Sequence, residues 1–589
     1  MSELTPKLAT RGPPEELSVI ASPPVSLPDS RHASLVPTAF TPTTMETMDS
    51  CFPAEPLEHQ SPNHNRSYDA AHGQFASRVA ATIEERADFI SPNMPSLIPL
   101  VDAPLFGNLV LPTGCSTFPI PTEMPARADA DQLVDLYWRY VDPAEPILDR
   151  HQFSEYYASS YSTSGVSHIQ LSIIHSVLAL AMQRREFITL DERDTAANTY
   201  FRRAWSLFPT ESVLWEPGSL EQVQCLMLMN RYLHCTNNQL KTWMTAGLAM
   251  RIAQNMCCHY PETSSADGSK NNSHLKRKVW ASCVFLDRCV SWSLGKTSAI
   301  YLIPSLKSFQ LQEMRDVEIF QWGLELHEIG NQIQLAQVET GSTLAARSVA
   351  RTLGQQEEYH TAAVHLDSCL NKWEMGLPSD FQLQNIKYLE NRTRRMERYL
   401  LHIRLLHSRI YLYRPILARF YLMKNDRQSN SINAPSLSER LLKEGARMCV
   451  EAAQAVASLI VETLDPNQTI GILPWWTRIY CLHIAGVIFL AAMVRSDLFT
   501  DSVSQSWQVV LAALRAHVHL STYVQQCIWT FEALSARILQ TGRVELQSEG
   551  EQLIDGADYC FDNIFEDIQF DFGEFLFRTE DVVNLDGLG

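Results

Sequence analysis

Apolar residues along much of this chain recur every three or four positions. Leu133, Leu136, Tyr137 and Tyr140 follow this spacing, which places them on one face of a helix. Two later segments repeat it in steps of four and three: Tyr399, Ile403, Leu406, Ile410 and Tyr413, and then Cys449, Ala453, Val456 and Ile460. No segment shows the sustained alternation of apolar and polar residues that a half-buried strand requires. The pattern predicts an all-α, large multi-helix domain.

Residues that start and stop helices interrupt this pattern. Pro217 and Gly218 form a turn, and Ser219 with Gln222 makes a capping-box pair that predicts a helix start. The helix that contains the segment from Tyr399 to Tyr413 is expected to end near Pro415, because proline removes a backbone donor and clashes with the preceding turn.

Composition divides the chain into three parts. Residues 1–128 hold 19 of the 30 prolines, mixed with Ser and Thr, and are expected to be a disordered leader. The helical pattern occupies residues 129–543. Its longest apolar run, residues 479–494, is 16 residues long and includes His483, whereas a membrane span needs about 20. We therefore expect a buried core helix there and no membrane contact.

Negative charge is concentrated in the third part, residues 544–589. The chain has a formal charge of −18; this tail holds 13 acidic residues and one base, Arg578, so it carries −12 and the other 543 residues share −6. None of those residues forms the basic stripe of a DNA-contacting module. The 13 cysteines are scattered and no apolar signal region follows Met1, which indicates a reducing intracellular compartment.

Fragments of catalytic and metal-binding motifs occur, and each lacks an essential residue. Gly295 precedes Lys and Thr, as in a phosphate-binding loop, but the motif needs glycine where Val290 stands, so a helix C-cap at Gly295 is favoured. His327 and Glu328 begin like a zinc-protease helix, whose second histidine would replace Asn331. No two cysteines have C-x2-C spacing. The sequence supports no catalytic, metal or cofactor site, and we expect no enzyme.

Two neighbouring segments carry an ordered set of residues. The first follows the pattern W-x3-G-x-A-x-R-x-A, with Trp243, Gly247, Ala249, Arg251 and Ala253. The second has a basic trio and then four landmarks, Trp280, Asp287, Arg288 and Gly295. In order and spacing they resemble the regulatory middle domain of fungal zinc-cluster transcription factors, the fungal-specific transcription factor domain. Residues Met256 to His259 stand where that family often has Leu-Gly-Leu-His.

The resemblance extends over about residues 130 to 500. Leu136 to Phe153 is similar to the domain's opening, and Arg414 with Pro415 matches a later landmark. After Gly295 the chain has Lys-Thr where the family has Arg-Pro. The resemblance implies that these landmark residues are mainly structural.

Packing alone accounts for the same landmarks. Gly247 and Ala249 would permit close helix contact, and Trp243 and Trp280 would supply large buried areas. Asp287 and Arg288 would form ion pairs or cap carbonyl groups.

The acidic tail interleaves aromatic residues with carboxylates. Six phenylalanines lie among Asp and Glu residues: Phe561, Phe565, Phe570, Phe572, Phe575 and Phe577. Acidic neighbours keep such side chains solvated and accessible to the groove of a partner. This texture predicts an activation segment that binds transcription coactivators; the alternative is a solvated tail with an aromatic anchor docked on the core.

The family usually carries six cysteines N-terminal to this domain, which bind two zinc ions beside a DNA-contacting basic segment. Residues 1–128 contain only Cys51 and Cys115. Zinc is therefore expected only if such a cluster is missing from the gene model. Mapping the 5′ end of the transcript would test where the gene model should start. Otherwise the protein reaches promoter DNA through a zinc-cluster partner.

The resemblance implies a nuclear transcription factor that regulates RNA polymerase II genes of metabolism or secondary metabolism. A homo- or heterodimer, a ligand response and the sign of regulation stay open. One alternative is a regulatory or ligand-sensing subunit that lacks DNA contact and partners a zinc-cluster factor. A helical enzyme is the remote alternative.

Overall fold

The computed structural model describes residues 75–88, 100–109, 124–258, 270–294, 298, 317–339, 349–422 and 436–549, apart from short gaps at 101, 105, 108, 145, 163–164, 210–212, 214, 216 and 466–467. These residues form helices and contain no strand, so the all-α expectation is confirmed. Their buried apolar side chains gather into two clusters, which we call the first core and the second core.

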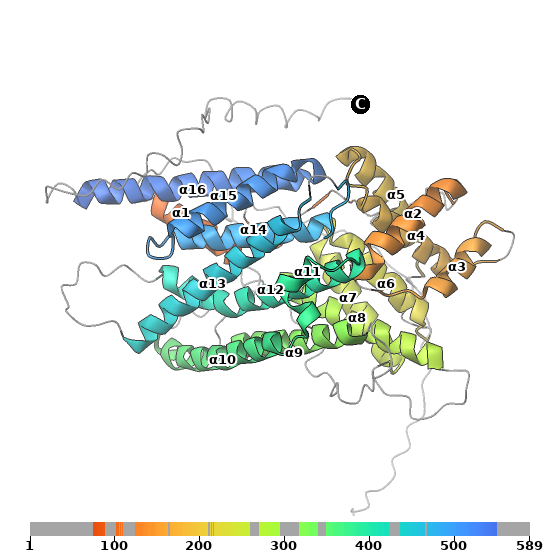
Figure 1. Cartoon of the computed structure of the whole chain (residues 1–589), viewed down its shortest axis with the longest axis horizontal. Coiled ribbons are helices and arrows are strands. Elements are labelled where there is room, and N and C mark those ends of the chain that lie inside the picture. The colour runs from red at the N-terminus through yellow and green to blue at the C-terminus, as the bar shows by residue number, and fades with distance from the viewer. Residues whose placement is uncertain are drawn as a thin grey trace, which may run out of the picture. The chain divides into compact units, whose positions relative to one another are not determined.

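The first core is built from helices that follow one another along the chain (Figure 1, orange to yellow-green). They are α2 (Arg127–Tyr140), α3 (Arg150–Ser159), α4 (His168–Gln183), α5 (Leu190–Leu207), α6 (Leu220–Leu233), α7 (Gln239–Asn255) and α8 (Lys270–Leu294). Helix α4 packs against α5 and α6, and α7 packs against α6 and α8. A short 3-10 helix, η1 (Asp142–Ala144), follows α2.

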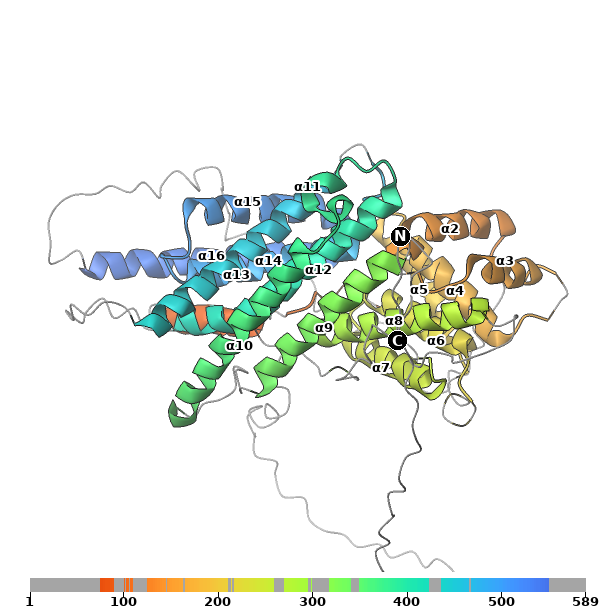
Figure 2. The same cartoon turned by 60° about the horizontal axis from the view of Figure 1, so that its bottom comes forward.

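The second core gathers the later helices together with one early helix. They are α1 (Phe75–Asp88), α9 (Val317–Glu339), α10 (Val349–Met375), α11 (Leu383–Ile386), α12 (Arg392–Leu422), α13 (Leu437–Glu462), α14 (Trp475–Met493), α15 (Asp501–Ala516) and α16 (Thr522–Glu549). Helices α12 and α13 lie side by side, with α9 and α10 beyond α12 and α14 beyond α13 (Figure 2).

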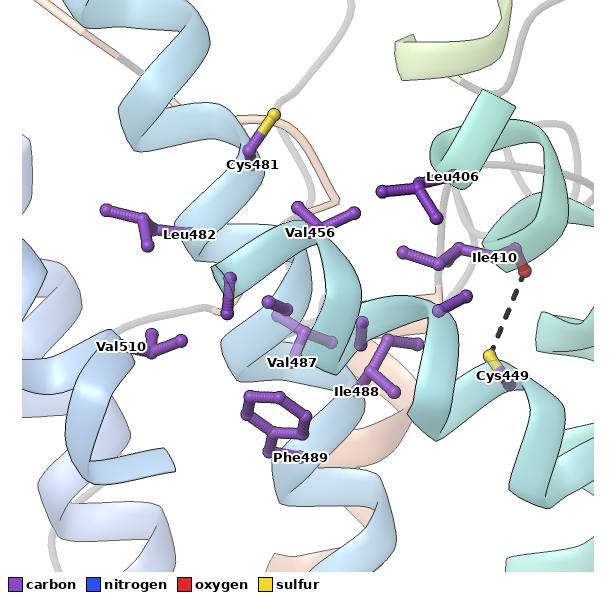
Figure 3. Packing of buried hydrophobic residues seen from close by; sticks show 14 of the residues in the cluster. Leu406, Ile410, Cys449, Val456, Cys481, Leu482, Val487, Ile488, Phe489 and Val510 are labelled. Carbon is purple, nitrogen blue, oxygen red and sulfur yellow. Dashed lines mark hydrogen bonds between the residues drawn. The ribbon is translucent and has the colours of Figure 1, made fainter. Parts of the chain in front are cut away.

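Helix α14 is the apolar centre of the second core. Figure 3 shows Val487 and Ile488 of α14 near side chains of α12 and α13, including Val456, and Leu482 on the side of Val510. Within the described residues, α14 is the one helix long and apolar enough to cross a membrane, but 72% of its apolar window is buried against its neighbours. The expected buried core helix at 479–494 is therefore present.

The expected leader, residues 1–128, is not uniform. Helix α1 lies within it, and Phe75, Ala76, Val79 and Ile83 are buried in the second core, where α1 packs against α16 and α14. The Asp102 carboxylate accepts from the backbone N–H groups of Phe75 and Ala76 at 3.2 and 2.6 Å, which satisfies donors at the start of α1. The expectation of disorder is wrong for these residues, because a short amphipathic helix among prolines is stabilised only by distant packing.

Helix α12 does not end near Pro415, and this expectation is also wrong. The helix continues to Leu422 with Pro415 inside it. Proline cannot bond the carbonyl of Tyr411, and the Gln337 side chain of α9 donates to that oxygen at 2.8 Å instead. The Tyr359 hydroxyl of α10 donates to the next carbonyl, that of Leu412, at 2.6 Å. Two neighbouring helices therefore satisfy the backbone that proline disturbs.

The expected helix start at Ser219 is confirmed. The Ser219 side chain accepts from the Gln222 N–H, and the Gln222 side chain accepts from the Ser219 N–H. A Cβ added at Gly218 would overlap the Ile252 side chain of α7, so the turn before this helix needs glycine for its close approach.

Candidate functional site: a cavity between the two cores

A cavity of about 230 Å³ lies where the first and second cores meet. The first core contributes the C-terminal end of α6 and one side of α8, and the second contributes α12 and α14. Residues Ala103, Pro104 and Phe106, from the segment expected to be a disordered leader, also line it. Phe106 is held in place by edge contacts with Trp475 and Tyr523, with ring centroids 5.1 and 5.7 Å apart.

Two helices present one face each to this cavity. Helix α12 contributes Leu400, Ile403, Arg404, His407 and Ile410, and α14 contributes Trp476, Thr477, Tyr480, Cys481 and Ile484. The spacing of three, four and seven places each set on one side of its helix. For α12, the spacing that predicted the helix therefore also orders its side of the cavity.

His407 and Tyr480 meet across the cavity wall. The histidine Nε2 lies 3.3 Å from the tyrosine hydroxyl, and the rings make an edge contact at 5.7 Å. Burial, followed by the charge of Arg414, lowers the pKa of His407 to about 4. The imidazole is therefore neutral near pH 7, and the pair offers a neutral hydrogen-bonding spot on an apolar wall.

Arg404 connects this cavity with a second one of about 270 Å³, because it lines both. Its guanidinium carbon lies 3.5 Å from the centroid of the Phe285 ring, a cation–π contact. On the same ring, His327 makes an edge contact at 4.0 Å. Burial, and then the charge of Arg404, lowers the pKa of His327 well below its usual value. A positive charge is thus held at the junction of the two cavities.

The second cavity is more polar and carries both signs of charge. Asp142 and Glu397 line it together with Lys278 and Arg404. Burial raises the pKa of Asp142 to about 6, and the nearby charges of Lys278 and Arg231 only partly oppose this. Its carboxylates already balance its cations.

A buried ionic network joins the two cores beside the first cavity. The Glu186 carboxylate, 5% exposed, pairs with Arg184 at 3.4 Å and with Arg478 of α14. Arg184 also donates to the Gly471 carbonyl at 2.7 Å. Burial lowers the pKa of Arg184 to about 10.

Two further contacts cross the same junction. The Trp475 indole N–H donates to the Gln183 carbonyl at 2.9 Å, and Arg193 donates to the Leu520 carbonyl at 2.6 Å. The cores are therefore held together by directional polar contacts as well as by packing.

Three of the five landmark residues of α7 serve packing, and Arg251 and Gly247 do not. Ala249 and Ala253 are buried in the first core, Trp243 packs against it, and Arg251 is exposed. Nothing lies within 4 Å of a Cβ added at Gly247, so the expectation of a close helix contact at this glycine is wrong.

The turn after α7 places a cysteine where the family often has glycine. Cys257 has a backbone φ of 55°. The backbone N–H of Cys257 donates to the Gln254 carbonyl at 2.9 Å, and that of Cys258 donates to the Ala253 carbonyl at 3.1 Å. This bonding pattern is a Schellman motif, whose left-handed position favours glycine.

The landmarks of α8 are buried. Trp280 is 2% exposed and supplies the expected buried area. Asp287 accepts a hydrogen bond from Ser298, and the Arg288 guanidinium lies 3.7 Å from Glu328 of α9. Gly295 lies outside the described residues, one position after α8 ends.

Arg414 and Pro415 lie on α12 and do not line the cavity. Arg414 pairs with Asp102 at 3.5 Å and lies over the rings of Phe75 and Tyr411. It thereby fixes the start of α1, a role that its place in the sequence pattern did not reveal.

The described residues contain no group of three or more His, Cys, Asp or Glu side chains placed to hold a metal ion. Cys258 and Cys283 are buried, Cys289 is half-buried and Cys257 is exposed. The six phenylalanines of the acidic segment, at 561, 565, 570, 572, 575 and 577, lie outside the described residues.

Comparison with known proteins gives a consistent picture. Residues 134–325 match the family model of the fungal specific transcription factor domain, which covers most of the first core and ends inside α9. A sorbicillinoid biosynthetic cluster transcription factor of Penicillium rubens is 56% identical over 98% of this chain and 82% of its own length. A second such factor, of Hypocrea jecorina, is 50% identical over 89% of this chain and 77% of its own length. The acetamidase regulatory protein of Aspergillus fumigatus is 28% identical over 31% of this chain and 23% of its own length.

Proposed function

Because the chain belongs to the family of transcription factors that carry the fungal-specific transcription factor domain, we propose that it controls the genes of a sorbicillinoid biosynthetic cluster. It is a regulator of transcription, and its family consists of transcription factors rather than enzymes. The observation that carries the proposal is identity of 56% and 50% to two sorbicillinoid cluster factors over nearly the whole chain.

Complementation tests this proposal directly. A Penicillium rubens strain that lacks its own factor 2 would receive this chain, the native factor 2, or an empty cassette. We expect the chain to restore sorbicillinoid cluster transcripts toward the level that factor 2 produces, as measured by quantitative PCR. Transcripts that stay at the empty-cassette level, with the chain present in the nucleus by immunoblot, would contradict the proposal.

The family supports a nuclear protein that works with DNA or regulatory partners, and the route to promoter DNA is a separate proposal. We infer that the helical domain, residues 129–543, acts in a complex that includes a zinc-cluster factor, because the chain belongs to a family of transcription factors that carry this domain. Chromatin immunoprecipitation should then recover cluster promoters, while the purified chain alone leaves promoter DNA unshifted in a gel. A specific shift by the purified chain would instead establish direct contact.

The acidic tail, residues 544–589, is proposed to activate transcription. Its six phenylalanines and its charge of −12 support this role. We expect a fusion of the tail to an unrelated DNA-binding domain to switch on a reporter. The matched control changes all six phenylalanines to Ala and keeps the charge; it should be silent, because coactivator grooves take up the aromatic side chains. Equal activity of both fusions, or a silent native tail, would count against the proposal.

A further inference from the structure

The cavity between the two cores has the size of a small ring-containing molecule. An apolar cavity of about 150 Å³ takes up one benzene molecule, and this one measures about 230 Å³. By that proportion it holds about nine non-hydrogen atoms in place of the six of benzene. An occupant of this size makes dispersion contacts with side chains on every wall.

Apolar side chains from several helices make up most of the lining. Helix α12 contributes Leu400 and Ile403, α14 contributes Trp476 and Ile484, and α8 contributes Leu286. The indole of Trp476 offers a flat face against which an aromatic ring can stack. The walls therefore favour a flat, apolar occupant.

The charged groups of the lining are already engaged. Arg404 also lines the second cavity beside two carboxylates, and its guanidinium lies over the Phe285 ring at 3.5 Å. The charge of Arg231 acts on the buried Asp142 carboxyl, and His234 has an interaction of its own. Among the described residues that line the first cavity, none is acidic. Neither an anion nor a cation would therefore find a counter-charge that is not already in use.

The neutral polar groups of the lining are also satisfied within the protein. The hydroxyls of Thr236 and Thr242 donate to backbone carbonyls at 2.8 and 2.9 Å. His407, whose pKa burial lowers to about 4, is neutral near pH 7 and lies in hydrogen-bond contact with Tyr480 at 3.3 Å. An ion that entered would lose its hydration without gaining a partner, whereas a neutral apolar molecule loses little.

A segment that connects the two cores forms part of the same wall. Leu100 and Phe106 are buried in the second core, and Leu109 is buried in the first. The Asn238 side chain donates to the Leu109 carbonyl at 3.0 Å, while the Phe106 ring lines the cavity. We call residues 100–109 the clasp, because they are anchored in both cores and lie against the cavity between them.

We propose that this cavity binds a small neutral molecule built on an aromatic ring, with about nine non-hydrogen atoms, between α12 and α14 and against the clasp. Because α6 and α8 also line the cavity, the ligand touches both cores and the clasp at once. Binding therefore holds these three parts together. It is a property of the chain itself and does not depend on which genes the protein controls.

The test uses the purified full chain and two probes of the same shape and size. Acetophenone is neutral, and benzoate has a carboxylate in place of its methyl ketone. A ligand-observed NMR titration measures each affinity. We expect a Kd of about 0.1–1 mM for acetophenone. Benzoate should bind at least about 10-fold more weakly, because its charge would be buried without a partner. Thermal unfolding should shift upward with acetophenone, since the ligand binds only the folded state.

Hydrogen exchange locates the bound probe. Acetophenone should slow exchange in the clasp, because Phe106 is part of the wall that the ligand contacts. Exchange in α3, which does not line the cavity, is the internal control and should stay unchanged.

Two variants of α14 assign the binding to the site. Ile484→Trp fills the cavity from a half-buried position and should abolish acetophenone binding. Met493→Trp is the matched control, because Met493 is half-buried on the same helix and does not line the cavity; it should bind acetophenone normally. Circular dichroism checks that each variant is folded.

Several results would overturn the proposal. They are benzoate binding as tightly as acetophenone, no upward shift with acetophenone up to its solubility limit, unchanged exchange in the clasp, or undiminished binding by Ile484→Trp. If Ile484→Trp does not fold, the two probes and the exchange measurement on the native chain still decide the matter.

Discussion

The two cores of this protein are assembled in different ways. The first core uses consecutive helices from 127 to 294, and their main contacts join helices close in sequence. The second core brings α1, near residue 80, against α16, which ends at residue 549. Neighbouring helices can be inferred from a local pattern, whereas the partner of a short early helix cannot. The family model accordingly matches mainly the first core.

Burial disfavours the charged form in both cores, but it acts on an acid in one and on bases in the other. At the edge of the first core, burial raises the pKa of Asp142 to about 6. In the second core, burial lowers the pKa values of His407 and His517 to about 4. Acidification therefore changes stability in opposite directions through Asp142 and through these two histidines. The junction between them is polar, with Glu186 buried between two arginines.

The largest effect is expected at the junction itself. Glu186→Gln removes the charge that compensates Arg184 and Arg478 in a buried setting, and should lower the free energy of unfolding by about 3–5 kcal/mol. Urea unfolding followed by circular dichroism measures this. The control is Glu444→Gln, which breaks a half-exposed pair with Arg447 and should cost less than about 1 kcal/mol. Equal losses in the two variants would contradict a structural role for the network.

The second prediction concerns pH. Between pH 6.5 and 4 the unfolded chain binds a proton at His517 that the folded chain does not, so stability falls on acidification, by up to about 3 kcal/mol for this group. Asp142 has the opposite sign, because between pH 6 and 3.8 its folded form binds the extra proton. Hydrogen exchange at pH 7 and pH 5 should therefore show α15, which ends beside His517, losing more protection than α2, which ends beside Asp142. His517→Gln should reduce that difference; an unchanged difference would exclude this histidine as its source.

The space around one glycine in each core gives a third prediction. A Cβ at Gly486 of α14 would overlap the Phe531 ring, so Gly486→Ala should destabilise the chain by about 1–3 kcal/mol. At Gly247 of α7 nothing lies within 4 Å, and Gly247→Ala should stabilise it by about 0.5–1 kcal/mol. Chemical unfolding midpoints compare the two. A lower unfolding midpoint in both variants would mean that α7 is as tightly packed as α14.

The smallest effect is expected in the turn after α7. Cys257→Gly should raise the free energy of unfolding by about 0.5–1 kcal/mol, because glycine adopts the left-handed conformation at φ of 55° without strain. Cys289→Gly, in the C-terminal part of α8, is the control and should cost about 1 kcal/mol. Thermal unfolding shows whether each variant is more or less stable than the native chain. Lower stability of Cys257→Gly would show that the backbone at this position is not strained.

Sequence reasoning located much of the scaffold and none of the cavity. The Ser219 capping box, the buried helix at 479–494 and the helical face of Ile403 and Ile410 follow from local spacing. The cavity was missed because its walls come from α6, α8, α12 and α14, and no local pattern states which helix faces meet. Arg404 and His407 carry no motif, so only their position in the cavity lining identifies them.

By itself, the sequence determined the all-α class, the main helices, the family landmarks and the concentration of acid in residues 544–589, because each depends on residues close together in the chain. Tertiary structure alone decided that α1 belongs to the second core, that α12 continues through Pro415 and that Glu186 bridges the cores. These outcomes depend on contacts between distant segments. Gln337 and Tyr359 satisfy carbonyls beside Pro415 from two other helices, and that compensation exists only after the chain has folded.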